Sequence, residues 1–207
     1  INKKIFLVHI STDEVYGHVI NNKSFSETTK YNPRSPYSAS KASADHLVSA
    51  WNSTYGYKST IVNCCNNFGP NQDKEKFIPV IINNILNNKK IPIYGNGKQK
   101  REWIYVDDFV ASIDFIISKN LFKENFVIGS GIRFENKIFA KKIISIFKNK
   151  LNYDEKKIKL IRVSDRPGHD IEYKIDSSKL RKLGWKPKTN ISNDLLKTIN
   201  FYKTKNK

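Results

Sequence analysis

Short apolar runs alternate along the chain with segments in which apolar residues recur at helical spacing. Residues 4–11 form the first apolar run and predict a buried strand, and the polar residues 13–36 predict a loop. Helical spacing over residues 44–55 predicts a helix, and the apolar run at 60–64 predicts the next strand. The order strand, loop, helix, strand indicates a parallel α/β unit.

The ends of the first helix are marked by three residues. Ser35 is suited to cap it, and Pro36 fits the first helical position, where the missing N–H costs nothing. Gly56 is suited to end it. We therefore expect a long helix from Pro36 to Gly56.

Helices and strands continue to mix in the rest of the chain. Asp107 is placed to cap a helix, a polar loop covers 165–170, and residues 203–207 predict a frayed tail. The other expected elements are a loop at 66–73, helices at 77–88, 107–119, 135–148, 177–183 and 192–202, a short strand and turn at 91–97, and strands at 101–106, 126–129 and 158–163. The expected fold class is α/β.

The composition is basic but not that of a disordered tail. The 207 residues hold 37 Lys and Arg against 19 Asp and Glu, a net charge of +18, with 12% aromatic residues. The lysines are spread along the chain and no zinc-finger or homeodomain pattern is present, so we expect no nucleic-acid partner. A basic field does favour anionic substrates such as sugar nucleotides.

The cysteines and the lengths of the apolar runs limit the compartments and partners that the sequence favours. The two cysteines, Cys64 and Cys65, are adjacent, which excludes a disulfide framework and favours a reducing, cytoplasmic location. No apolar run approaches the roughly 20 residues of a membrane span, so we expect no membrane partner. No His or Cys cluster has metal-ligand spacing, and we expect no metal.

Tyr37 and Lys41 form the first candidate for chemistry. They lie four residues apart in the first turns of the predicted helix, which puts them on one face. An ammonium beside a phenol lowers the phenol pKa from about 10, so that it can accept a proton from a sugar hydroxyl. The same spacing occurs twice more in the chain, so the pair alone is weak evidence.

Asp13 and Glu14 follow the first strand and form the second candidate. Ligands bind at the carboxyl edge of open parallel sheets, where this pair falls. Two adjacent carboxyl groups can act as acid and base if their surroundings separate their pKa values. The alternative is a solvated turn.

The motifs STDEVYG at 11–17 and SPYSASKA at 35–42 resemble the signatures of the dTDP-glucose 4,6-dehydratases. These enzymes belong to the extended short-chain dehydrogenase/reductase superfamily. The match continues in order through residues 63–70, 75–79, 92–95, 101–108, 165–170 and 183–187. It covers essentially the whole chain. The Asp-Glu pair is its most discriminating part, because the epimerases and decarboxylases of the superfamily generally lack it.

The resemblance implies a cofactor, NAD, and a role for each catalytic residue. Tyr37, assisted by Lys41, would take the proton of the carbon-4 hydroxyl while Thr12 bonds the carbon-4 oxygen. Glu14 would remove the hydrogen of carbon 5, and Asp13 would protonate the carbon-6 hydroxyl as it leaves as water. Hydride would then return to carbon 6. The product would feed deoxysugar synthesis such as that of rhamnose.

Binding residues follow from the same resemblance. Tyr37, Lys41 and Asn67 would contact the cofactor. The substrate contacts would be Thr12, Asn66, Lys76, Phe77, Pro92, Ile93, Tyr94, Arg101, Asn136, Arg166 and His169. Arg101 is the natural pyrophosphate clamp, because a guanidinium binds phosphate through two parallel N–H groups.

The resemblance also implies an architecture, with one departure. We expect the C-terminal part of a Rossmann-like parallel sheet with a smaller α/β substrate-binding domain. Residues 1–65 would carry the catalytic residues, and 66–207 would mainly bind the sugar nucleotide, with about 98–128 returning to the Rossmann sheet. The Gly-rich NAD turn of the family does not occur in these residues. We therefore expect an N-terminal part to be missing, and little NAD affinity or turnover without it.

Without the missing part, strands that should pair with it would form exposed sheet edges. The family's dimers use the helix that carries Tyr37 and Lys41, so residues 44–55 are expected to face a second subunit. Three alternatives stay open: UDP-glucose as the substrate, an epimerase or decarboxylase of the superfamily, and an inactive fragment that only binds a sugar nucleotide.

Overall fold

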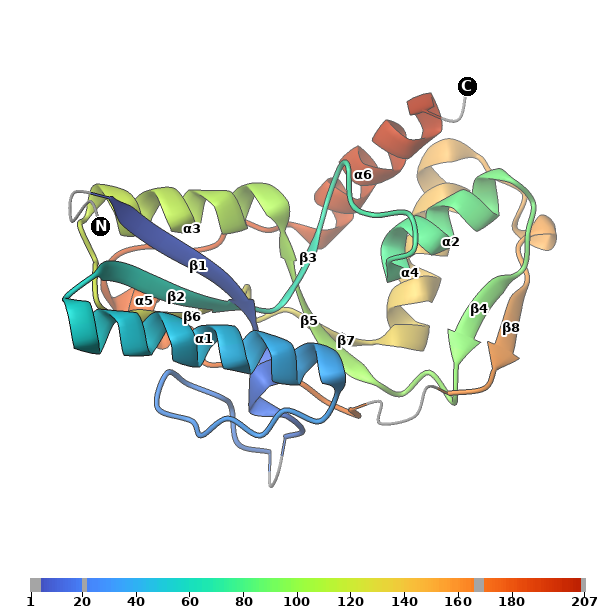
Figure 1. The fold of residues 1–207 in the computed structure, drawn as a ribbon. Helices are drawn as coiled ribbons and strands as arrows, with labels where there is room; N and C mark the ends of the chain where they lie inside the picture. Colours follow the sequence, from blue (N-terminus) through green and yellow to red (C-terminus); the bar gives the residue numbers. More distant parts are fainter. Residues whose placement is uncertain (1–4, 20–21, 166–169, 206–207) are drawn as a thin grey trace.

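A computed structural model describes residues 5–19, 22–165 and 170–205. Figure 1 shows two parts, one built on a sheet beside the long helix α1 and one holding α2, α4 and the pair β4–β8. Among the described residues, no helix combines the length and the apolar character needed to cross a membrane.

The first sheet is parallel and contains β1 (Phe6–Thr12), β2 (Lys58–Cys64) and β6 (Asn125–Ile128) in the order β1-β2-β6. Thr12 pairs with Cys64, and Cys64 with Ile128, so the three carboxyl ends meet at one edge. The one-turn helix η1 (Asp13–Tyr16) follows β1 at this edge, and α1 (Pro36–Tyr55) leads back to β2.

The second sheet continues from the first. β3 (Asn66–Phe68) starts after a single residue beyond β2 and pairs in parallel with β5 (Lys100–Tyr105), which pairs antiparallel with β7 (Arg133–Glu135). α3 (Val106–Ser118) follows β5 directly. The predicted strands at 101–106 and 126–129 are thus both present, but the first joins β3 and β7 while the second joins β2. The division into two domains stays a prediction.

The remaining elements include the pair of parallel strands β4 and β8. Their bounds are α2 (Phe77–Leu86), β4 (Ile91–Tyr94), α4 (Asn136–Leu151), η2 (Glu155–Lys157), β8 (Leu160–Val163), α5 (Ser178–Lys182) and α6 (Ile191–Lys205). The expected α/β fold class is confirmed.

The buried apolar side chains form two separate cores. One packs η1 and the strands β2 and β6 through side chains such as Val15, Val62 and Phe126. The other packs α2 against α4 and α6 through side chains such as Ile82, Phe139 and Ile199. Burying a large apolar side chain contributes about 1.5–3 kcal/mol, so each core is a substantial source of stability.

Two local expectations are wrong. Asp107 does not cap α3, which begins at Val106 after Tyr105 without a side-chain cap, because Asp107 already lies in the first turn. The tail is not frayed at 203–205, because α6 runs to Lys205. Its last turns are tied to the loop before α2: the hydroxyl of Tyr202 donates to the carbonyl of Gln72, and Lys205 Nζ donates to Asn71 Oδ1 at 2.9 Å.

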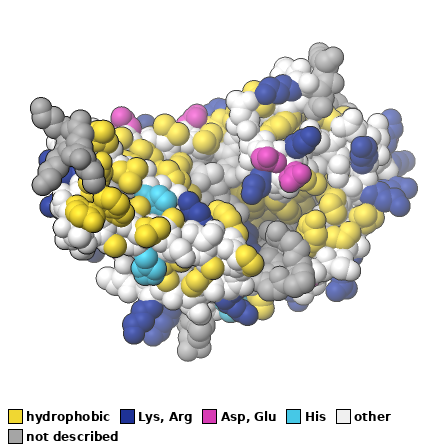
Figure 2. Space-filling model, viewed as in Figure 1, with side chains coloured by type: hydrophobic (Ala, Val, Ile, Leu, Met, Phe, Trp, Pro, Cys, Tyr) yellow, Lys and Arg dark blue, Asp and Glu magenta, His cyan; other side chains and the backbone are white. Residues whose placement is uncertain are grey.

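The apolar stripe of α1 does not face the core of this chain. Leu47 is 62% exposed, Trp51 45% and Tyr55 53%, while the buried residues of the helix are Ser38, Ala42 and Asp45. Figure 2 shows hydrophobic side chains gathered over the α1 and β1 end of the molecule. The expectation that this face meets a second subunit stays a prediction.

Candidate active site

The turn after β1 carries both candidate carboxyl groups. Thr12 caps η1, and its Oγ1 accepts a hydrogen bond of 3.2 Å from the backbone N–H of Glu14. Gly17 ends the turn at φ +76°, and a Cβ at this position would collide with the carbonyl of Asn32. The turn buries Asp13 and leaves Glu14 half-buried on the wall of a cavity.

Asp13 is a carboxyl group kept away from water. It is 2% exposed, and burial raises its pKa from 3.8 to about 8. The charge of Glu14 raises this pKa further, while Arg101 and the hydrogen bond from Thr12 lower it. Thr12 Oγ1 donates to Oδ1 at 3.4 Å, and Oδ2 has no hydrogen-bond partner among the described residues. Asp13 therefore holds a proton at neutral pH that it can donate.

The first turns of α1 present Tyr37 and Lys41 beside this turn. The Ser35 hydroxyl accepts from the backbone N–H of Ser38 at 3.1 Å, and the Ser38 hydroxyl accepts from that of Ser35 at 3.0 Å. This reciprocal cap fixes where the helix begins. Tyr37 is 55% exposed, and Lys41 Nζ donates to the carbonyl of Ile10 at 2.6 Å.

The expected lowering of the Tyr37 pKa is wrong in this structure. Partial burial raises the pKa of the phenol, and the charges of Glu14, Cys64 and Asp13 raise it further. A hydrogen bond with Thr12 acts in the opposite direction. The ammonium that was expected to stabilise the phenolate is bonded to the backbone of β1 instead.

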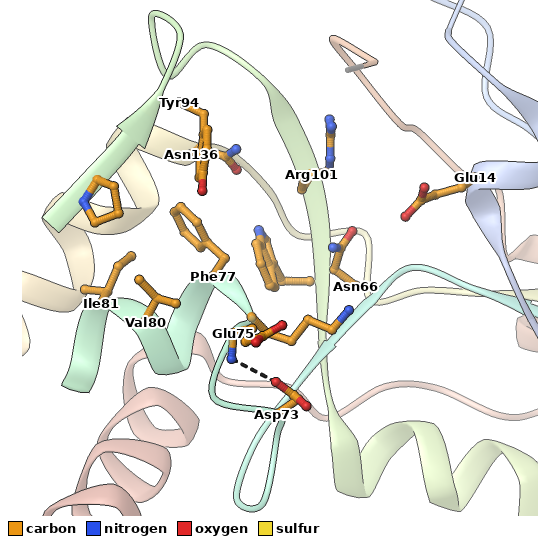
Figure 3. Close-up of a pocket in the computed structure, with 13 residues that line it drawn as sticks. Glu14, Asn66, Asp73, Glu75, Phe77, Val80, Ile81, Tyr94, Arg101 and Asn136 are labelled. Carbon is orange, nitrogen blue, oxygen red and sulfur yellow. Dashed lines mark hydrogen bonds between the residues drawn. The ribbon is translucent and has the colours of Figure 1, made fainter. Parts of the chain in front are cut away.

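A cavity of about 460 Å³ lies between the second sheet and α2 (Figure 3). Its lining residues are Glu14, Asn66, Asp73, Glu75, Lys76, Phe77, Val80, Ile81, Pro92, Tyr94, Arg101, Trp103 and Asn136. In Figure 3 the Glu14 carboxyl group points toward the side of the cavity that holds Arg101 and Asn66, while Phe77 and Tyr94 lie at the other side. The cavity thus has a charged end and an aromatic end.

Most of the residues expected to bind substrate meet in this one cavity. Ile93 does not line it, because its side chain is 6% exposed and packs in the second core. The sequence reasoning missed Asp73, Glu75, Val80, Ile81 and Trp103. Trp103 had a signal, since it follows Arg101 by two residues on a strand and so shares its face.

Arg101 is held by backbone carbonyl groups and is 7% exposed. Nη2 donates to Asp170 O at 2.7 Å, Nη1 donates to Lys100 O at 2.9 Å and to Ile171 O at 3.4 Å, and the guanidinium lies 4.3 Å from the centre of the Tyr173 ring. Burial lowers its pKa, and the facing phenol and carboxyl groups oppose this. A guanidinium has five N–H donors, so this set leaves an edge available to an anion.

Cys64 is the last residue of β2, and Asn67 lies just beyond it in β3. Asn67 Nδ2 donates to Cys64 Sγ at 3.4 Å and to Cys65 O at 3.3 Å, and its buried Oδ1 has no hydrogen-bond partner among the described residues. Burial raises the pKa of the Cys64 thiol to about 12, so it stays protonated. Arg166 and His169, both expected to contact substrate, lie outside the described residues.

The chain is similar to several known proteins. A family model described as GDP-mannose 4,6 dehydratase matches residues 1–198. A dTDP-glucose 4,6-dehydratase of Escherichia coli is 43% identical over 209 residues, which cover 94% of this chain and 58% of that protein. The chain therefore spans well under two thirds of this curated relative.

Two solved structures are similar to most of the chain. The dTDP-glucose 4,6-dehydratase of Streptomyces venezuelae, solved with NAD and dTDP bound, gives a TM-score of 0.86 at 36% identity, covering 96% of this chain and 60% of that one. That of Bacillus anthracis, solved with NAD, gives 0.87 at 36% identity, covering 98% and 63%.

Proposed function

Because the chain belongs to the GDP-mannose 4,6 dehydratase family, we propose that the protein containing it removes water from a nucleoside-diphosphate glucose. The substrate would be dTDP-glucose, with UDP-glucose as the alternative, and the product its 4-keto-6-deoxy form. The similarity to dTDP-glucose 4,6-dehydratases at 43% identity supports the first of these nucleotides.

The observation that carries this proposal is the contrast between Asp13 and Glu14. Asp13 is buried with a pKa of about 8, whereas Glu14 is half-buried on the cavity wall. Elimination of water needs a proton donor at the leaving hydroxyl and an acceptor for the hydrogen of the neighbouring carbon. A protonated carboxyl group next to a cavity-facing one supplies this pair of functions.

Each catalytic residue then has one task. Tyr37 is assigned as the acceptor of the carbon-4 hydroxyl proton from its place beside Thr12 and not from its pKa, which burial raises. The Thr12 hydroxyl bonds the carbon-4 oxygen. The carbonyl group formed at carbon 4 acidifies the hydrogen of carbon 5, which Glu14 takes as a proton. The carbon 6–oxygen bond breaks, and Asp13 gives its proton to the departing hydroxyl, which leaves as water.

Residues at the carboxyl edge of the first sheet fit NAD. The Tyr37 phenol and the Lys41 ammonium lie at this edge. The buried Oδ1 of Asn67 has no hydrogen-bond partner within the described part of the chain, and a ligand N–H would supply one. Bound NAD+ would accept the hydride from carbon 4 and, as NADH, would return it to carbon 6, while Glu14 returns its proton to carbon 5. We propose Tyr37, Lys41 and Asn67 as its contacts in this chain.

The cavity orients the rest of the substrate. We place the nucleoside base at the aromatic end, against Phe77 and Tyr94, because flat rings stack on aromatic side chains. The pyrophosphate would lie at the free edge of Arg101, and the hexose toward Glu14. With this orientation the hexose lies at the charged end of the cavity, next to the turn that carries Asp13 and Glu14.

Mass spectrometry tests the proposal directly. The complete protein, incubated with NAD+ and either dTDP-glucose or UDP-glucose, should convert one of them to a product lighter by one water. Loss of water from both at equal rates would mean that the cavity does not discriminate between the two nucleoside bases. No loss from either would refute the dehydratase assignment.

We also propose a homodimer and a cytoplasmic location. The exposed Leu47, Trp51 and Tyr55 of α1 support a second copy on this face, since a large exposed apolar patch usually marks an interface. The two buried free thiols, Cys64 and Cys65, suit a reducing compartment.

A further inference from the structure

Asp45 is a buried acidic residue on the catalytic helix that has no part in the proposed chemistry. It is 1% exposed, and it follows Tyr37 by eight residues and Lys41 by four, so the three share a face of α1. Charged side chains are rarely buried to this extent unless their acceptor atoms are filled. The groups that contact its two carboxylate oxygens therefore indicate its role.

Four side chains converge on this carboxyl group. Oδ2 accepts hydrogen bonds from Ser11 Oγ at 2.8 Å, from Tyr31 Oη at 2.9 Å and from Asn63 Nδ2 at 3.1 Å. Oδ1 lies 3.0 Å from Nε2 of His9. The contacts come from β1, from β2 and from the loop before α1, so Asp45 joins three segments to the helix.

These contacts reach both sides of the catalytic turn. Ser11 directly precedes Thr12, and Asn63 Nδ2 also donates to the carbonyl of Thr12 at 3.2 Å. Asn63 Oδ1 accepts from the hydroxyl of Tyr16, the last residue of η1, at 3.2 Å. Asp13 and Glu14 thus sit between two points that are tied to Asp45.

Polar contacts, rather than apolar packing, hold α1 against the rest of the chain. Of its twenty residues only Ser38, Ala42 and Asp45 are fully buried, so a single apolar side chain anchors the helix deeply in this chain. An ordinary surface helix is held by an apolar stripe, and the stripe of α1 is exposed. The contacts of Asp45, together with the hydrogen bond from Lys41 to the Ile10 carbonyl, therefore hold the helix against β1.

We propose that Asp45 is a positioning residue that fixes Tyr37 and Lys41 on α1 relative to Asp13 and Glu14 on η1. This inference rests on the proposed function, because it assigns the two pairs to one reaction. A displacement of about 1 Å between reacting groups can reduce the rate on the order of a hundredfold. The substrate cavity is built largely from α2, β4 and β5, so it should survive a shift of α1.

The test is Asp45→Asn in the complete protein, with Asp194→Asn as the matched control. Asp194 is also a buried acid, 5% exposed, but it accepts a hydrogen bond from the backbone N–H of Asn190 in the other core region. We expect Asp45→Asn to lower kcat about ten- to a hundredfold with KM for the sugar nucleotide within about threefold. Asp194→Asn should leave both nearly unchanged.

Hydrogen exchange supplies a readout that does not depend on activity. In Asp45→Asn, amides of residues 10–16 should exchange about tenfold faster or more, whereas those of α2 should keep their rates. Unchanged exchange at 10–16, or equal loss of kcat in the two variants, would overturn the inference. If the unmodified protein removes no water from any sugar nucleotide, the proposed function fails instead, and the exchange data still decide the role of Asp45.

Discussion

Replacing Asp13 by Asn should make the protein more stable and nearly inactive. The folded state keeps this carboxyl protonated, with a pKa of about 8, whereas an unfolded chain ionises it above its ordinary value of 3.8. Folding at pH 7 therefore requires uptake of a proton that the unfolded chain has released. Asn needs no proton, so its folding carries no such cost.

The size of the effect follows from the two pKa values. Each unit between 3.8 and the working pH costs the native protein about 1.4 kcal/mol until the folded pKa of about 8 is reached. At pH 7 the burden is on the order of 4 kcal/mol. Oδ2 of Asp13 has no partner among the described residues, so the Asn amide leaves two N–H donors unbonded where the protonated carboxyl leaves one O–H, which offsets about 1–3 kcal/mol of this gain.

Because the pKa of Asp13 is higher in the folded than in the unfolded protein, the stability difference depends on pH. The advantage of Asp13→Asn should be absent at pH 4, grow as the pH rises, and level off above about pH 8. Urea unfolding of both proteins between pH 4 and 9 measures it, and kcat of the variant should fall by about a hundredfold or more because the proton donor is lost. Asp194→Asn, whose oxygens accept hydrogen bonds, should instead lose about 1 kcal/mol. A stability difference for Asp13→Asn that is absent, or that does not change with pH, would refute the reasoning.

Three further substitutions test other parts of the site. Tyr37→Phe should lower kcat about a hundredfold or more while isothermal titration finds sugar-nucleotide affinity unchanged, and an unchanged kcat would remove its role as base. Arg101→Lys should raise KM about tenfold or more for the sugar nucleotide, because an ammonium lacks the two-pronged edge, and an unchanged KM would place the pyrophosphate elsewhere. Leu47→Glu, at a 62% exposed position, should turn a dimer into a monomer in light scattering without changing the melting temperature by more than a few degrees, and a persistent dimer would locate the interface off α1.

Local signals in the sequence predicted the parts of the fold that depend on neighbouring residues. The bounds of α1 follow from Ser35, Pro36 and Gly56, and all three act within one turn of the helix. The strands β3 and β7 were not expected, because each has three residues and exists only through pairing with β5. Strands this short leave no readable alternation in the sequence.

The same contrast applies to the site. Asp13 and Glu14 were found from their place after a strand, but the pKa that makes Asp13 an acid comes from burial, which the sequence does not display. The pKa of Tyr37 is raised and not lowered because partial burial and the neighbouring Glu14 act on the phenol, and the sequence displays neither.

The tether between α6 and the loop before α2 has a consequence for ligand binding. Asn71 and Gln72 are held by the last turns of α6, and the residues that follow them, Asp73 and Glu75, form part of the cavity wall. Fixing one residue of a flexible loop costs roughly 1–2 kcal/mol of backbone entropy. Here that cost is met when the chain folds, so an arriving nucleotide finds a wall that is already ordered and keeps more of its contact energy as affinity.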